Sequence, residues 1–594
     1  MKEKTLKADL AVIGGGLSGI CAAIVAARLG SRVVLIHDRP VLGGNASSEI
    51  RVWVRGASGK YNREGGILRE LELENIYRNP TLNYSLWDGV LYEKVTAEKN
   101  ITLLLNTSCL DAACTDGRIT SVRAWQLTTY TYYTVEAELF ADCSGDSILA
   151  EPTGALYRVG REAKDEYKEP MAQDVADSHT MGMSCLINAR ETDHPVEFIP
   201  PSFSRVYADD DDFSARPRPE TGGKGKTHTV HTDANFWWIE KGGERDSLHD
   251  TEEVSRELQS VVYGIWDHVK NRGEHHAEKF EVDWIGALPG KRESRRYIGD
   301  YVLTANDLID GGDFPDAVAY GGWTMDNHDP RGIDAEGYSS THYGVHSPYQ
   351  IPLRSLYSKN IENLFFAGRN ISATHMALSS TRVMATCSLL GQAVGTAAAV
   401  CHRYGLSPRE AAEQKITLIQ QILLENDCYI PKVARPISPI NATAQSNLSR
   451  ADRDVLESGL DRPSESASNA VAFDAGSVLT YRLEVPADGV ALHLVFDPDY
   501  ERTSISEHHK YRAFAMRGHV YTGMKPLRMP KELVRAFTVT DGEGVVIYES
   551  QNNRLASHLI DLPNGTKEVC ITLQKAWGGE QIKLFSCDFT ERRN

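Results

Sequence analysis

Residues 8–45 read ADLAVIGGGLSGICAAIVAARLGSRVVLIHDRPVLGGN, and their pattern predicts a strand, a tight turn, a helix and a second strand. A short apolar run, residues 10–13, ends in three glycines, and small residues follow over a helical length. The spacing Gly14-x-Gly16-x-x-Gly19 is the dinucleotide fingerprint, whose glycines make the turn, admit a pyrophosphate and let helix and strand pack closely. Backbone amides and partial positive charge at the helix N-terminus favour a diphosphate. We therefore predict a nucleotide-binding unit; the alternative for this motif alone is a flexible glycine turn.

The size and charge of the chain limit its organisation and its partners. Its 594 residues exceed one ordinary hydrophobic core, so we expect two or three domains. With 41% apolar and 24% charged residues the composition is that of a globular protein. We see no apolar run of the roughly 18 residues that a membrane span needs. A formal net charge of −17 disfavours nucleic acid as a partner.

Cysteines and histidines give no sign of a disulfide framework or a metal centre. The ten cysteines contain no C-x-x-C pair, and no H-x-x-x-H spacing among the 19 histidines falls in a predicted helix. We therefore expect reduced, mostly buried thiols and no metal site. No signal peptide is visible before the first strand, although a sequence trimmed before Met1 would hide one. These features together predict a cytoplasmic protein.

The end of the second strand departs from the usual dinucleotide pattern. An acidic residue is expected there, about 20 residues past the glycines, to accept hydrogen bonds from the ribose hydroxyls. This chain has His37 at that point and Asp38 next to it. Either Asp38 takes the role after a shift of one residue, or the imidazole of His37 does so less tightly. The identity of the nucleotide must therefore come from other motifs.

Three later motifs supply that information. Residues 39–49, RPVLGGNASSE, place a glycine pair and polar groups after the second strand. Residues 142–146, DCSGD, and residues 363–370, NLFFAGRN, each close an apolar strand. A helix is expected at residues 380–403, with small residues at four-residue spacing that would let it press against a cofactor or the first helix.

Together these segments resemble the two-dinucleotide-fold FAD oxidoreductases, and specifically a bacterial family of FAD-dependent oxidoreductases with the signatures RPxLGGNASSE and NLxxAGRxIS. We call the second signature, residues 363–372, the second dinucleotide motif. The resemblance runs over residues 8 to about 402. It implies FAD as cofactor, bound noncovalently because Asn45 stands where some related flavoenzymes attach FAD through a histidine. The implied FAD contacts, from diphosphate through ribose and flavin to the ribityl side, are Gly14, Gly16, Gly19, Asp38, Arg39, Gly44, Asn45, Ser48, Gly145, Asp146, Gly368 and Arg369.

The resemblance and the change of pattern along the chain predict the domain organisation. Residues 1–150 and 346–431 would form an α/β FAD-binding domain of the Rossmann-like, glutathione-reductase type, and residues 151–345 an inserted α+β substrate domain. Residues 432–469 read as a linker or a long wrapping segment. From residue 470 to 594 short alternating strands indicate an antiparallel β-sandwich. Such domains bind carbohydrate, with Trp577 or Tyr521 as candidates here, or cover a neighbouring domain.

Alcohol oxidation needs a base near the carbinol, and histidine has a suitable pKa. His375 is our first candidate, because in the similar enzymes the connection from Gly368 to the following helix passes the isoalloxazine ring. His328, flanked by carboxylates, is the second, although a lone loop histidine is more often a surface residue. In residues 288–297, LPGKRESRRY, either Arg292 or Arg296 would hold polar substrate atoms, unless this is a solvated charged turn.

Two classes of function follow. The first is an FAD-dependent dehydrogenase or oxidase acting on a hydroxyl group of a small polar substrate, such as a sugar or glycoside, with hydride transfer to the flavin. The second is a glycan-binding or scaffold protein that retains an FAD fold, and intact glycines at every motif argue against it. A reductive or redox-neutral flavin reaction would use the same residues.

Overall fold

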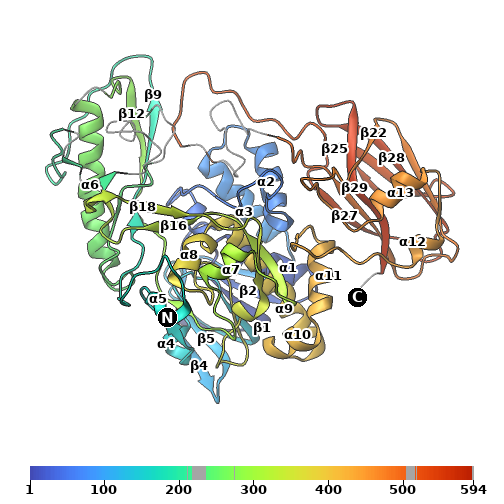
Figure 1. The fold of residues 1–594 in the computed structure, drawn as a ribbon, viewed down its shortest axis with the longest axis horizontal. Coiled ribbons are helices and arrows are strands. Elements are labelled where there is room, and N and C mark those ends of the chain that lie inside the picture. Colours follow the sequence, from blue (N-terminus) through green and yellow to red (C-terminus); the bar gives the residue numbers. More distant parts are fainter. Residues whose placement is uncertain are drawn as a thin grey trace.

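The computed structural model describes residues 1–209, 212–213, 215–216, 230, 236–272, 275–502, 516 and 518–591. Figure 1 shows three parts side by side: the insertion with its long helix α6, a central body that carries both helices and strands, and a C-terminal region of strands. The central body and the insertion have separate hydrophobic clusters, and so does the C-terminal region.

A parallel sheet forms the middle of the body. Its order is β3 (Ile101–Leu104), β2 (Val33–Ile36), β1 (Lys2–Ile13), β6 (Thr131–Asp142) and β20 (Leu364–Phe366). The last residues of β1, β6 and β20 lie in register, because Ile13 pairs with Asp142 and Asp142 pairs with Phe366. The three loops that follow these strands therefore meet at one edge of the sheet, where ligands bind in open α/β sheets.

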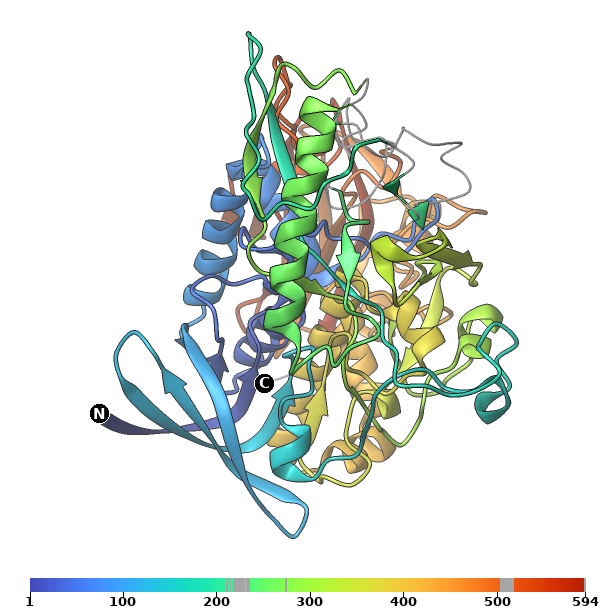
Figure 2. The ribbon, with the colours of Figure 1, turned by 90° about the vertical axis from the view of Figure 1, so that its left-hand side faces the viewer.

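An antiparallel extension projects from this sheet. Strands β4 (Thr107–Thr115) and β5 (Arg118–Gln126) form a hairpin, and β5 pairs with the first half of β6. The sequence Asp116-Gly117 predicts a two-residue hairpin turn at this point, and the φ angles of 50° and 75° confirm it. Figure 2 shows this extension standing away from the body beside the N-terminus.

A layer of helices packs against the parallel sheet. α1 (Leu17–Arg28) packs along α9 (Met384–Tyr404), with Cβ positions on Gly391 and Gly395 only 2.0 and 2.3 Å from backbone oxygens of α1. The expected single helix at residues 380–403 is instead two helices, α8 (His375–Thr381) and α9, because Val383 is extended and starts the second. The remaining helices of the body are α2 (Gly66–Arg78), α3 (Tyr84–Thr96), α4 (Ala150–Thr153), α10 (Pro408–Gln414) and α11 (Ile416–Glu425).

One described helix, α9, has the length and hydropathy of a membrane span. However, 94% of its most apolar window is buried inside the protein. This burial is that of a core helix, since its smooth glycine face lies against α1.

The insertion consists of small sheets around α6 (Thr251–Asn271). Its elements are β7 (Tyr157–Arg158), α5 (Lys164–Tyr167), β8 (Met183–Ser184), β9 (Ile187–Glu191), β10 (Ala215–Arg216), β11 (Glu240–Lys241), β12 (Phe280–Ile285), β13 (Gly290–Lys291), β14 (Arg296–Tyr297), α7 (Ala305–Asp310), β15 (Ala317–Gly321), β16 (Met325–His328), β17 (Gly337–Tyr338), β18 (Ser340–Tyr343) and β19 (Tyr349–Pro352). The buried face of α6 packs in the separate core of this region. Strand β16 contacts α8, and this places the insertion beside the second dinucleotide motif.

The C-terminal region is a two-sheet antiparallel sandwich. One sheet has the order β21 (Gln445–Ser446), β23 (Val478–Arg482), β28 (Glu568–Ala576), β25 (Val534–Asp541) and β26 (Val546–Ser550). The other has the order β22 (Val471–Asp474), β29 (Gln581–Glu591), β24 (Val490–Phe496) and β27 (Ser557–Asp561). The segment read as a linker supplies β21, α12 (Ile440–Thr443) and α13 (Arg450–Leu456), and both helices pack on β29. It is therefore built into the sandwich rather than hanging free.

The aromatic residues considered for glycan binding lie in contacts between regions. The ring of Trp577 packs edge-on against Tyr77 of α2, and its indole nitrogen donates to the backbone oxygen of Asn553 at 2.7 Å. Tyr521 packs against Phe280 in the insertion, where the backbone of Val520 pairs with β9. The sandwich thus contacts both other regions of the protein through these residues.

Candidate functional site

In the first glycine turn, Gly14 and Gly19 have no room for a side chain, whereas Gly16 borders open space. A Cβ atom at Gly14 would lie 2.5 Å from the backbone oxygen of Cys143, and one at Gly19 would lie 1.8 Å from that of Gly14. A Cβ at Gly16 meets nothing within 4 Å in the described chain. Gly16 also precedes α1 without a side-chain cap among the described residues, so the first amides of the helix face this open space. The geometry is that of a diphosphate cradle.

A second glycine turn stacks directly on the first. The amide of Gly43 donates to the oxygen of Gly15 at 2.8 Å, and a Cβ at Gly44 would lie 3.1 Å from the Cα of Gly16. The side-chain amide of Asn45, one residue further on, donates to the backbone oxygen of Lys291 at 3.0 Å. The backbone amide of Ser48 donates to Asp88 at 3.0 Å. These contacts fix the loop after the second strand against both the glycine turn and the insertion.

His37 holds the first glycine turn in place through hydrogen bonds. Its Nδ1 accepts a hydrogen bond from the amide of Gly15 at 3.0 Å, and its Nε2 donates to the oxygen of Val41 at 3.0 Å. Burial lowers the pKa of His37 to about 4, which keeps the ring in the neutral form that this bonding requires. Both ring nitrogens are therefore used inside the protein. Of the two alternatives at this strand end, only Asp38 has an exposed side chain, 60% accessible, that can reach a ribose.

The loops after β6 and β20 are joined by charged groups. Asp146 accepts from Arg369 at 2.5 Å and from Ser294 at 2.8 Å, and Lys291 lies 3.2 Å away. Burial alone would raise the pKa of Asp146, but the opposing effect of Arg369 and Lys291 is larger, and the pKa falls to about 2. The carboxylate is thus held by protein cations rather than presented to a ligand. Gly368, with φ +124°, is the neighbouring position where the backbone turns.

Buried polar atoms without partners mark the same region. Such atoms are costly unless a ligand or water satisfies them. Within the described part of the chain they include Arg39 Nη1, Glu49 Oε2, Arg369 Nε, Asn370 Oδ1, Ser372 Oγ, Thr381 Oγ1, Arg382 Nε and Thr386 Oγ1. Six such atoms lie between residues 369 and 386, the segment from the second dinucleotide motif to the start of α9. The open glycine cradle and these polar atoms fit a long, polar dinucleotide.

His375 starts α8 in a fully buried, polar setting. Its side-chain Nδ1 lies 2.9 Å from Glu293 and its Nε2 lies 2.9 Å from the amide oxygen of Asn327. Its backbone amide donates to Glu162 at 2.8 Å, and Thr374 caps the helix. The side chain of Glu293 is completely buried. Although burial raises the pKa of Glu293, the His375 ring holds it below its usual value.

His328 lies next to Asn327 but has different partners. Its Nδ1 is 2.6 Å from Glu240 and its Nε2 is 3.2 Å from Asp326, so both nitrogens face carboxylates. Arg292 joins the same cluster, since it pairs with Glu240 at 3.1 Å and donates to Ser184 Oγ at 2.8 Å. The three residues predicted for catalysis therefore lie in two adjoining buried networks. Arg292 and His328 share one carboxylate, and His375 belongs to the other network.

Several members of these networks were not singled out from the sequence. They are Glu162, Glu240, Glu293, Asp326, Asn327 and Arg382. Glu293 and Asp326 stand beside predicted residues, so their position in the chain was a usable signal. Glu240 and Arg382 gave none, because their partners His328 and Asp326 lie 88 and 56 positions away.

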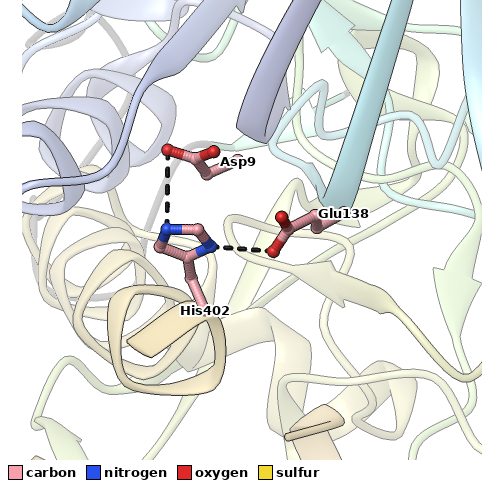
Figure 3. Close-up of side chains that lie close together, drawn as sticks. All are labelled: Asp9, Glu138 and His402. Atoms are coloured by element: carbon pink, nitrogen blue, oxygen red, sulfur yellow. Dashed lines mark hydrogen bonds and ion pairs between the residues drawn. The ribbon is translucent and has the colours of Figure 1, made fainter. Parts of the chain in front are cut away.

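A group of possible metal ligands lies away from this region. Figure 3 shows His402 between Glu138, 2.7 Å from its Nδ1, and Asp9, 3.7 Å from its Nε2. Arg32 already binds Asp9 through its backbone amide at 2.7 Å and its guanidinium at 2.5 Å. A bound arginine leaves this carboxylate little charge for a cation, so the group is an ion-pair cluster.

Comparison with known proteins assigns the class. The family model described as FAD dependent oxidoreductase matches residues 9–423, more than two thirds of the chain. The protein therefore belongs to this family of FAD-dependent flavoenzymes, and FAD is its cofactor. The match covers the glycine cradle, the insertion and the second dinucleotide motif.

The solved structures that match the chain are distant from it in both sequence and structure. A geranylgeranyl bacteriochlorophyll reductase-like protein from Thermoplasma acidophilum is 12% identical, with a TM-score of 0.31 over 71% of this chain and 86% of its own. The p-nitrophenol 4-monooxygenase PnpA of Pseudomonas putida is 12% identical, with a TM-score of 0.30 over 70% of this chain and 84% of its own. The myxobacterial chondrochloren halogenase CndH is 12% identical, with a TM-score of 0.32 over 70% of this chain and 82% of its own. No curated protein matches the chain.

Proposed function

We propose that this FAD-dependent oxidoreductase oxidises a hydroxyl group of a small polar substrate to a carbonyl, with His375 as the base. Nε2 of His375 takes the hydroxyl proton as the substrate loses two electrons and its carbinol hydrogen. FAD, when bound, supplies the acceptor for that hydride. Glu293 is a positioning residue, because its contact with Nδ1 leaves Nε2 as the nitrogen that faces the reaction.

The observation that carries the proposal is the difference between the two buried histidines. Both nitrogens of His328 face carboxylates of the protein, so neither nitrogen is left to face a substrate. Nε2 of His375 faces the amide of Asn327, a neutral group that presents either an oxygen or an N–H by turning over. Nε2 can therefore either donate or accept, as a general base must.

Asn327 gives the proposal its binding element. It is half-buried, whereas His375 is 1% exposed, so Asn327 lies on the more accessible side of the pair. A substrate hydroxyl that displaces or joins this amide would meet Nε2 directly. The amide would then hydrogen-bond the same oxygen and hold it beside the base.

Anaerobic titration of the FAD-loaded protein tests this function. A panel of sugars, polyols and hydroxy acids is added, and the loss of oxidised-flavin absorbance is followed. At least one alcohol is expected to reduce the flavin, and His375→Gln is expected to slow that reduction while FAD stays bound. Reduction at equal rates in the variant would remove His375 from the mechanism. A protein that takes up no flavin but binds glycan would favour the scaffold function, and substrate-dependent reoxidation of reduced flavin would favour a reductive reaction.

A further inference from the structure

Arg382 lies on the same side of α8 as His375. The two residues are seven positions apart, two helical turns, or about 10 Å along the axis. Strand β16 runs beside both of them: Asn327 contacts His375, while the backbone oxygen of Asp326 accepts from Arg382 Nη2 at 3.1 Å. A small molecule bound at His375 would therefore lie within reach of this guanidinium.

The hydrogen-bonding groups of Arg382 are only partly satisfied by its neighbours. Its Nη2 is 3.6 Å from the Asp326 carboxylate, and its Nε is buried without a hydrogen-bond partner in the described chain. Asp326 also contacts His328 and His342, and Glu240 contacts both His328 and Arg292. Burial lowers the pKa of Arg382; the carboxylates of Asp326, Glu240 and Glu293 oppose that effect, and Arg292 adds to it.

The other arginines near the site are bound inside the protein. Arg296, 1% exposed, pairs with Glu162 at 2.9 Å, and Arg292 donates to the Trp237 backbone oxygen at 2.9 Å as well as pairing with Glu240. The side chains of Arg292 and Arg382 are similarly exposed, 11% and 12%, but Arg292 is bound to Glu240, Ser184 and Trp237, whereas Nε of Arg382 has no hydrogen-bond partner in the described chain. The role that the sequence suggested for Arg292 or Arg296 therefore suits Arg382 better.

We propose that the substrate is a hydroxy carboxylic acid, such as a sugar acid, whose carboxylate binds Arg382 while its hydroxyl lies at His375. This inference rests on the proposed function. The unpartnered Nε of Arg382 leaves hydrogen-bonding capacity for an anion, and the planar guanidinium fork matches a carboxylate.

Matched pairs of compounds test the proposal on the FAD-loaded protein. Gluconate is compared with glucitol, and glucuronate with glucose, because each pair differs mainly at the carboxylate. Binding is read from perturbation of the flavin spectrum, and reduction from loss of absorbance under anaerobic conditions. The wild-type protein is expected to bind at least one acid about tenfold or more tightly than its neutral partner, the scale of one charged hydrogen bond.

Three variants complete the design. Arg382→Gln is expected to remove the preference for acids, so that each acid and its neutral partner bind with similar affinity. Arg382→Lys, which keeps the charge but not the fork, is expected to retain part of the preference and guards against a folding defect in the first variant. Arg331→Gln is the control, since this exposed side chain pairs with Asp329 away from the two networks.

Each outcome decides one question. No acid preference in the wild type, or equal losses for acids and neutral compounds in Arg382→Gln, overturns the proposal. A shift of the flavin spectrum or potential in Arg382→Gln without any added compound also overturns it, because Arg382 would then serve the cofactor. Acid binding that depends on Arg382 without flavin reduction would support the carboxylate site and refute hydroxyl oxidation.

Discussion

Nδ1 of His375 lies 2.9 Å from the carboxylate of Glu293, a residue 82 positions earlier in the chain. Both side chains are essentially inaccessible to solvent. The pair joins two regions, since Glu293 comes from the insertion and His375 from the segment that follows the second dinucleotide motif. The strongest buried contact of the candidate base is therefore made by the insertion.

The first prediction concerns this pair. His375→Gln is expected to lower the rate of flavin reduction by about 10²- to 10⁴-fold, the usual contribution of a general base. Glu293→Gln keeps the hydrogen bond but removes the anion beside the ring, so the acidic limb of the pH–rate profile is expected to move to lower pH. Stopped-flow reduction between about pH 5 and 9, where histidine titrates, measures both effects. His402→Gln, outside the site, serves as control and is expected to behave as wild type.

The second prediction uses two glycines of the same motif. Gly19→Ala places a Cβ 1.8 Å from a backbone oxygen, so the turn must open and the protein is expected to lose stability by several kcal/mol, about the cost of severe overpacking. Gly16→Ala meets no atom and has φ −68°, so its stability is expected to be unchanged. The methyl group added at this position would instead occupy the cradle and weaken FAD binding. Thermal unfolding of apoprotein and FAD titration separate the two; equal behaviour would contradict the cradle.

The third prediction is a pH dependence carried by His37. Its pKa is lowered from 6.5 to about 4 in the folded protein. A depressed pKa means that the unfolded chain takes up the proton first, so the stabilisation is complete above about pH 6.5 and is lost as the pH falls towards 4. Stability and FAD retention are expected to fall together over this window. His37→Gln should flatten that part of the curve; an unchanged slope in fluorescence-detected FAD release would exclude His37 as its source.

The fourth prediction concerns the attachment of the former linker to the sandwich. Arg435 is buried and pairs with Asp588 at 2.6 Å and Asp461 at 2.8 Å. Arg435→Met leaves buried carboxylates without a partner and is expected to cost about 3–5 kcal/mol. Arg450→Met removes an ion pair with Asp454 whose arginine is 89% exposed, and is expected to cost less than about 1 kcal/mol. Chemical denaturation of both variants provides the comparison, and similar losses would contradict the structural role of Arg435.

The cofactor cradle was predictable because its requirements are local. The positions of Gly14, Gly16 and Gly19 depend only on a turn of six residues, and the Asp-Gly hairpin turn depends only on two residues. The predicted helix at residues 380–403 failed in part for the opposite reason. Its composition suits one helix, but Val383 is extended and the thiol of Cys387 reaches back to the oxygen of Arg382 at 3.4 Å. Such contacts cannot be read from the hydrophobic periodicity of the sequence.

By itself the sequence determined a dinucleotide-binding α/β fold with an insertion and a C-terminal set of strands, because glycine spacing and hydrophobic period act over a few residues. FAD and the candidates His375, His328 and Arg292 followed from this pattern together with its resemblance to a flavoenzyme family. Only the tertiary structure decided the partners of these residues, since Glu240 reaches His328 across 88 positions and Glu293 reaches His375 across 82. Charge balance and access depend on those distant contacts, which are the reason for proposing Arg382 rather than Arg292 as the anion-binding residue.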